Sequence, residues 1–164
     1  MKLEKVAARM SRDLGEAVFV GAFAVRCHIG PYRSTLDIDL AIASSITDSR
    51  LRELGYLVTE ERGKHVTRTK DGIKVDIFTR DVSGISIADI FETSITKQVE
   101  NEDLRIMALE ALLIAKLRAS RAQDIEDIRI LCQRLKRTIR WNIIDRLAAS
   151  TESSELRNII NALG

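Results

Sequence analysis

The sequence predicts an α+β fold in which a mixed β-sheet is followed by a C-terminal helical bundle. Through the first half of the 164 residues, short apolar or alternating segments typical of strands are interspersed with helical segments. From Ala108 onwards, every segment has helical periodicity. Strands joined through helices can be parallel, whereas Asp71-Gly72 is a turn signal for an antiparallel hairpin, so we expect both kinds of pairing.

Length and composition are those of one globular domain with a substantial core. Hydrophobic residues make up 45% of the chain and charged residues 30%, a balance that excludes a disordered protein. No apolar run approaches the ~20 residues of a membrane span. The charged N-terminus does not have the pattern of a secretory signal, and Cys27 and Cys132 form no metal-ligand motif. We therefore expect a cytoplasmic protein with reduced thiols.

The elements of the first half follow from apolar periodicity and from the glycines and caps that interrupt it. In chain order they are an amphipathic helix over about 2–14, a strand over 17–20, a short helix over 22–30, a strand over about 36–42, a helix capped by Ser44, Ser45 or Thr47 that runs to Leu54, strands over 56–60, 64–69 and 73–78, and a short helix after the capping-box residues Ser86 and Asp89.

The second half is expected to hold four helices after a short extended piece at 104–107. The helices cover about 108–120, 122–136, 139–149 and 153–163. We expect a core of residues 1–105 and a helical region of residues 106–164 that pack together as one unit. Nine basic and four acidic residues lie between Lys116 and Arg146, so this helical surface can meet phosphates or simply be solvated.

Two aspartates occupy one side of the strand expected at 36–42. Because side chains alternate along a strand, Asp37 and Asp39 point away from the side that carries its large apolar residues, which are Leu36, Ile38, Leu40 and Ile42. One interpretation is the solvated face of an antiparallel sheet. The other is a magnesium site, since Mg2+ prefers carboxylate oxygens together with substrate phosphates.

Two further features favour the metal site. Asp76 is a single acid within the strand at 73–78, and a hairpin can bring it beside Asp37 and Asp39. Three carboxylates on neighbouring strands can hold two metal ions for phosphoryl transfer. Gly21 ends a strand where a helix begins, so a phosphate can approach the backbone N–H groups there.

Residues 18–42 resemble the signature of the polymerase-beta-type nucleotidyltransferase superfamily; they read 18-VFVGAFAVRCHIGPYRSTLDIDLAI-42. In that superfamily a strand ends in a small-residue turn, a short helix follows, and the next strand carries Asp-x-Asp. The residues Gly21, Ala24, His28, Arg33, Thr35, Asp37 and Asp39 are similar to the pattern of the AbiEii-like subgroup, which includes toxins of prokaryotic toxin–antitoxin and defence systems. A helical signature of the same subgroup is matched by Lys116, Ala119, Arg121, Asp124 and Asp127.

The resemblance implies a nucleotidyltransferase fold and assigns roles to these residues. Asp37, Asp39 and Asp76 would bind two Mg2+ ions, and Asp76 would also act as general base. Gly21 and Ala22 would hold phosphate through their backbone, while Arg33 and Lys116 would contact the triphosphate. Alternatives remain open for Arg33, which can pair with Asp37 and Asp39, and for Lys116, which can extend to solvent.

Supporting roles would fall to Thr35, Arg121, Asp124 and Asp127. The last three can instead form a charge ladder on a helix surface.

The implied reaction transfers a nucleoside monophosphate from an NTP to an acceptor, either an RNA end such as that of tRNA or a protein hydroxyl, with a cognate antitoxin as a possible partner. The chain departs from the family pattern at Ala22, where Gly or Ser is usual, and at Ile29, which displaces the expected glycine to Gly30. The alternative is a binding or regulatory module that has the fold and weak or no activity.

Overall fold

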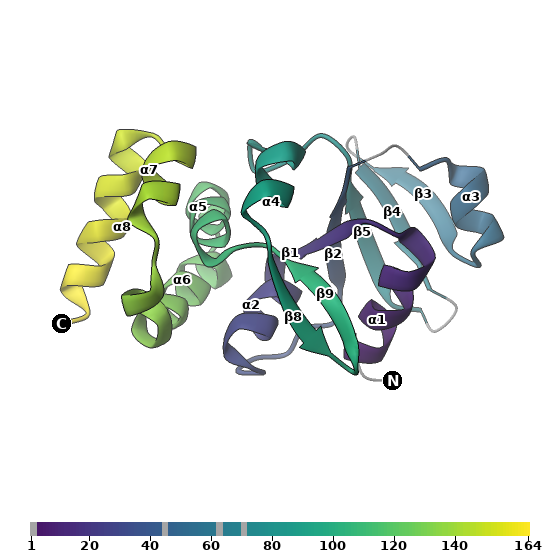
Figure 1. The fold of residues 1–164 in the computed structure, drawn as a ribbon, viewed down its shortest axis with the longest axis horizontal. Helices are drawn as coiled ribbons and strands as arrows, with labels where there is room; N and C mark the ends of the chain where they lie inside the picture. The colour runs from purple at the N-terminus through teal and green to yellow at the C-terminus, as the bar shows by residue number, and fades with distance from the viewer. Residues whose placement is uncertain (1–2, 44–45, 62–63, 70–71) are drawn as a thin grey trace.

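A seven-stranded mixed sheet forms the centre of the computed structural model, which describes residues 3–43, 46–61, 64–69 and 72–164. Its strands lie in the order β3-β4-β5-β2-β1-β9-β8 (Figure 1). They are β1 (Ala17–Val20), β2 (Ile38–Ile42), β3 (Leu57–Glu61), β4 (Lys64–Arg68), β5 (Lys74–Phe78), β8 (Ile95–Val99) and β9 (Glu102–Ile106). A separate small hairpin pairs β6 (Asp81–Val82) with β7 (Ile85–Ser86).

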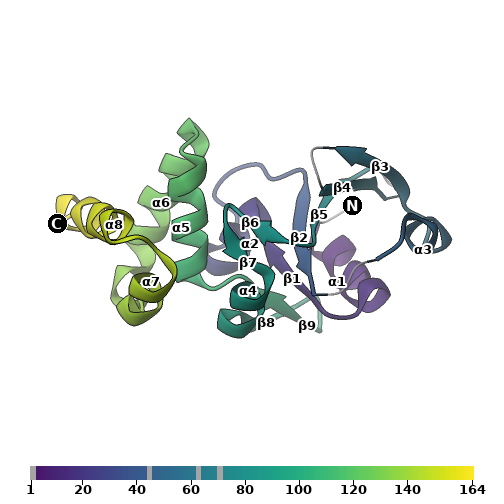
Figure 2. The ribbon, with the colours of Figure 1, turned by 90° about the horizontal axis from the view of Figure 1, so that it is seen from above.

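Helices surround the sheet and continue beyond it to form one end of the molecule. They are α1 (Leu3–Leu14), α2 (Gly21–Ile29), α3 (Asp48–Glu53), α4 (Ile87–Thr93), α5 (Leu109–Ala119), α6 (Ala122–Leu135), the short 3-10 helix η1 (Lys136–Thr138), α7 (Trp141–Leu147) and α8 (Ser150–Ala162). Viewed from above, α5 and α6 lie between the sheet and the outer pair α7 and α8 (Figure 2). The predicted α+β fold with a C-terminal helical region is confirmed.

The pairing of the central strands brings the acidic residues together. β5 is antiparallel to β4, as the expected hairpin requires, and parallel to β2 on its other side. In the parallel pair, Asp39 lies directly beside Asp76. The expectation that a hairpin brings Asp76 to the other acids was therefore wrong, because the hairpin partner of β5 is β4. Asp71 of the expected turn lies outside the described residues, as do the cap candidates Ser44 and Ser45. Thr47 caps α3 by accepting a hydrogen bond from the backbone N–H of Arg50.

One hydrophobic core spans the sheet and the first two helices of the C-terminal region. Phe19 and Phe23 are fully buried with Leu112 and Leu131 in the same cluster. The expected amphipathic helix is present as α1, and it buries Val6, Ala7, Ala8 and Met10. The division at residue 105 remains a prediction. None of the helices in the described ranges combines the length and apolar character that a membrane span needs.

Two expectations about strands were wrong or incomplete. Leu36 does not face the core: β2 begins at Ile38, and the Leu36 side chain lies in the preceding loop with 76% exposure. The strand β8 was not predicted, because the middle of its three half-buried positions is Lys97 rather than an apolar residue. An edge strand tolerates such a residue, whose long stem covers apolar surface while its charge reaches water.

Candidate active site

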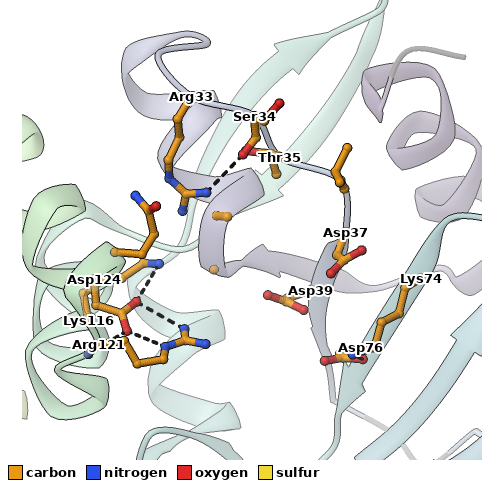
Figure 3. Close-up of a pocket in the computed structure, with 14 residues that line it drawn as sticks. Arg33, Ser34, Thr35, Asp37, Asp39, Lys74, Asp76, Lys116, Arg121 and Asp124 are labelled. Carbon is orange, nitrogen blue, oxygen red and sulfur yellow. Dashed lines mark hydrogen bonds and ion pairs between the residues drawn. The ribbon is translucent and has the colours of Figure 1, made fainter.

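A cavity of about 510 Å3 lies between the sheet and the C-terminal helices, and we call it the polar cavity. Strands β2 and β5 supply one wall, and helices α5 and α6 supply the opposite wall (Figure 3). Its lining consists of Gly21, Ala22, Arg33, Ser34, Thr35, Leu36, Asp37, Asp39, Lys74, Asp76, Lys116, Arg121, Gln123 and Asp124. All of the residues predicted for the site except Asp127 therefore line one cavity.

The sheet wall is acidic. Asp39 and Asp76 are neighbours across β2 and β5, and Asp37 lies immediately before β2 and lines the same cavity. Exposure falls along the series, because Asp37 is exposed, Asp39 is half-buried and Asp76 is buried. Lys74, on the same face of β5, places its Nζ 3.8 Å from Asp76 Oδ1. Neighbouring carboxylates repel one another unless a positive charge lies among them, and Lys74 supplies one beside Asp76.

Gly21 forms the corner between the acidic wall and helix α2. Its φ of +63° is in the left-handed region that favours glycine. A Cβ at this position would lie 2.4 Å from Asp39 Oδ2, so the absence of a side chain lets the Asp39 carboxylate lie against the first residue of α2. A negative charge beside a helix N-terminus is stabilised by the unpaired backbone N–H groups and by the helix dipole.

The helical wall carries a buried network of charges. Lys116 is only 7% exposed, and its Nζ lies 3.1 Å from Asp124 Oδ1 and 2.8 Å from Asp127 Oδ2. Arg121 Nε donates to Asp124 Oδ2 over 2.7 Å, while its own side chain is 76% exposed. The i,i+3 pair of Arg121 and Asp124 is present, but Asp124 and Asp127 are 1% and 0% exposed, so the two carboxylates do not form a solvated ladder on the helix surface.

Burial and pairing act in opposite directions on this network. Burial lowers the pKa of Lys116, and the hydrogen bond and charge of Asp124 counteract that effect only in part. Burial alone would raise the pKa of Asp124, but hydrogen bonds from Arg121 and Lys116 hold it below its ordinary value. Lys116 therefore does not extend to bulk water; its ammonium is held by carboxylates at the floor of the polar cavity.

Arg33 joins the loop between α2 and β2 to helix α6. Its Nε and Nη2 each donate to the Asp127 carboxylate over 2.9 Å, and the hydroxyl of Tyr32 donates to the same carboxylate. Asp127 thus holds the loop and Lys116 at once from behind the cavity wall. The alternative in which Arg33 pairs with the strand aspartates is not found: Arg33 forms this bidentate pair with Asp127 instead and still lines the cavity.

The donor set suits a hard divalent cation. Asp37, Asp39 and Asp76 offer only carboxylate oxygens to the same cavity, Asp39 and Asp76 from adjacent strands and Asp37 from the residue before β2. As their side chains stand, no group of three or more His, Cys, Asp or Glu residues within the described ranges is close enough to hold a metal ion. The residue types and their common wall fit magnesium, and binding would require the carboxylates to turn toward one another.

Four lining residues were not predicted from sequence: Ser34, Leu36, Lys74 and Gln123. Lys74 could have been predicted as a site residue from the sequence, because it lies two residues before Asp76 and so shares its face of the strand. Ser34 and Leu36 belong to the loop that carries Arg33 and Thr35. No sequence pattern pointed to Gln123 as a site residue. In the structure its Nε2 donates to Asp127 Oδ1 over 3.3 Å.

Sequence comparison places the chain in a defined class. A sheet that carries paired aspartates beside a glycine-led helix is the arrangement expected of a nucleotidyltransferase. Residues 1–162 match the model of a family described as nucleotidyltransferase of unknown function (DUF6036), and the chain belongs to that family. No curated protein matches the sequence. The assignment to a nucleotidyltransferase family is confirmed, whereas the AbiEii-like subgroup remains a prediction.

Solved structures with the same fold are similar to the chain over most of its length. The antibiotic-resistance factor ANT(2'')-Ia has a TM-score of 0.60 and 16% identity, with 98% of this chain and 89% of that chain covered. The lincosamide antibiotic adenylyltransferase LnuA has a TM-score of 0.59 and 15% identity, with 80% and 96% covered. JHP933 from Helicobacter pylori has a TM-score of 0.55 and 15% identity, with 99% and 92% covered.

Proposed function

We propose that this protein is a metal-dependent nucleotidyltransferase that transfers a nucleoside monophosphate from an NTP to an acceptor hydroxyl. The observation that carries the proposal is the division of one cavity into an acidic wall of Asp37, Asp39 and Asp76 and a wall that presents Lys116 and Arg121. Carboxylates suit the metal ions that accompany a triphosphate, and the cations suit its phosphate oxygens.

In the proposed reaction the acceptor oxygen attacks the α-phosphorus of the NTP. A new oxygen–phosphorus bond forms, the bond between the α-phosphorus and the bridging oxygen breaks, and pyrophosphate leaves. The acceptor proton passes to Asp76, the most buried of the three acids. Two Mg2+ ions held by Asp37, Asp39 and Asp76 would neutralise charge on the attacking, leaving and phosphate oxygens.

The remaining residues would bind and orient the triphosphate. Gly21 and Ala22 offer backbone N–H groups to phosphate at the start of α2, beside the Asp39 carboxylate. Lys116 and Arg121 would supply positive charge to phosphate oxygens, with Asp124 and Asp127 holding Lys116 in place. Arg33 and Thr35 would border the phosphates from the loop before β2.

For the acceptor we propose chemical classes of molecule and not one compound. An RNA end such as that of tRNA, or a protein hydroxyl, follows from the resemblance to AbiEii-like toxins, and a cognate antitoxin would then be the partner in the cytoplasm. A small hydroxylated molecule is the competing acceptor. It is favoured because six of the nine basic side chains between Lys116 and Arg146 are engaged in ion pairs, which leaves less free positive charge for a polyanion. LnuA was solved with lincomycin bound, a precedent for such an acceptor on this fold.

The proposal is tested by label transfer. The protein is incubated with each α-labelled NTP, Mg2+ and either total RNA, cell lysate or a set of small hydroxylated compounds. Transfer should disappear in Asp39→Asn and Asp76→Asn and persist in Asp103→Asn, which changes an exposed carboxylate on β9 outside the cavity.

Measuring NTP binding together with label transfer distinguishes an active nucleotidyltransferase from a binding module that has the fold but weak or no activity. Ala22 lacks the hydroxyl of the usual serine, and this favours the weakly active or inactive module. Mg2+-dependent NTP binding without transfer to any acceptor would support that module. Absence of both binding and transfer would overturn the proposed function.

A further inference from the structure

A second cavity of about 140 Å3 adjoins the polar cavity. The two share Gly21, Asp39, Lys116, Arg121 and Asp124 in their linings. Ser83 and six apolar side chains complete the second cavity, which we call the apolar annex. The apolar residues are Val20, Phe78, Val82, Leu112, Ala115 and Ala119.

The two cavities differ sharply in chemistry once the shared residues are set aside. The remaining lining of the polar cavity is mainly charged or hydrogen-bonding, and it includes Asp37, Lys74 and Asp76. The remaining lining of the annex is apolar apart from Ser83. A nucleotide has the same division, because its triphosphate is strongly charged whereas its base is flat, with extensive apolar faces and only a polar edge.

We propose that the apolar annex binds the nucleobase of the NTP; this rests on the proposed function. Lys116, Arg121 and Asp39 stand at the junction, so a base in the annex places the α-phosphate beside Asp39. Pyrophosphate and acceptor then share the polar cavity. Asp76 lines the polar cavity and is not part of the annex lining, which agrees with its role toward an acceptor that enters from that side.

Phe78 is the residue through which the annex would recognise the base. It follows Asp76 by two positions and so lies on the same face of β5. Among the described residues that line either cavity, it is the only aromatic one. Contact between a base and an aromatic ring gives affinity with little sequence preference, so the annex is expected to accept more than one base.

The experiment compares the four Mg2+–NTPs with Mg2+–tripolyphosphate, which carries the phosphates and no base. Dissociation constants are measured by calorimetry for the wild type and for the Phe78→Leu and Phe78→Ala variants. We expect Phe78→Ala to weaken NTP binding by about 5-fold to 150-fold, the range typical of base–aromatic stacking, and to leave tripolyphosphate binding unchanged. Phe78→Leu retains apolar bulk and should fold normally, with a smaller loss of the same kind.

Leu57→Ala is the matched control. It removes an apolar side chain that is 70% exposed and lines neither cavity, so neither ligand should bind differently. The inference is overturned if the wild type binds NTPs no more tightly than tripolyphosphate, or if folded Phe78 variants weaken both ligands equally. Either result leaves the proposed function standing. Failure of the wild type to bind either ligand would overturn the proposed function together with the inference.

Discussion

The Asp39 carboxylate occupies the space that a side chain at Gly21 would fill. A Cβ on Gly21 would lie 2.4 Å from Asp39 Oδ2 and 3.2 Å from its Cγ. Asp39 lies in β2 and pairs with Val20 of the antiparallel strand β1, and Gly21 follows Val20 directly. The glycine is therefore required by the acid beside it, in addition to any role in leaving the helix terminus open to phosphate.

Gly21→Ala should destabilise the fold more than Gly15→Ala does. Both glycines have positive φ, +63° and +70°, but an added Cβ meets nothing within 4 Å at Gly15. The backbone cost is about 1–2 kcal/mol at either site, and overpacking against Asp39 adds about 1–3 kcal/mol at Gly21. Urea unfolding of the two variants measures the difference. Adding Asp39→Ala should recover part of the Gly21→Ala loss, and equal losses in the two single variants would contradict this interpretation.

Lys116→Met should cost about 3–5 kcal/mol of unfolding free energy, because it leaves two buried carboxylates without their shared cation. Chemical denaturation measures this loss. The double variant Lys116→Met/Asp124→Asn should lose less than the sum of the two single changes. Strict additivity would show that the Lys116–Asp124 ion pair contributes no coupling to stability.

Arg33→Gln should loosen the loop between α2 and β2 while leaving the core intact. The bidentate pair with Asp127 and the hydroxyl of Tyr32 hold this loop to α6. Amide hydrogen exchange of residues 32–37 should accelerate, with exchange in β1 unchanged. Arg50→Gln is the control, because its ion pair with Glu53 is exposed and local. Unchanged exchange in the loop would show that Arg33 does not anchor it.

His28 should make the fold less stable as the pH falls below its ordinary pKa of 6.5. Burial lowers the pKa of His28, its hydrogen bond to the Met107 carbonyl opposes that effect, and Lys97 and Glu110 act in opposite directions. The unfolded chain then binds a proton at a higher pH than the folded chain does, so stability declines from 6.5 toward the lower, folded-state value.

The histidine effect is isolated by comparing unfolding free energies of the wild type and His28→Gln at several pH values. Glutamine can keep a donor near Met107 and does not titrate. The difference between the two proteins should shift in favour of the variant as the pH falls through this window. A difference that stays constant with pH would show that His28 does not contribute to the pH dependence.

Much of the site is encoded in local sequence. Strand periodicity alone places Asp37 and Asp39 on one side, and the glycine at position 21 marks the turn into α2. The Ser86 cap is also local, and the structure contains one half of the expected capping box: Ser86 Oγ accepts from the Asp89 backbone N–H over 3.1 Å, and its hydroxyl donates to the Asp89 carboxylate. These predictions succeed because each depends on the chemistry of a few consecutive residues.

Tertiary structure decided the rest. The neighbour relation of Asp39 and Asp76 comes from a parallel pairing of strands far apart in sequence, and no local pattern specifies its register. The same holds for Arg33 and Asp127, which are 94 positions apart. The exposure of Leu36 and the apolar annex likewise depend on where strands begin and how helices pack on them. The sequence by itself determined which groups are candidates for the site, and long-range packing determined which of them lie together. The physical reason is that periodicity acts within one element, so it does not specify contacts between elements.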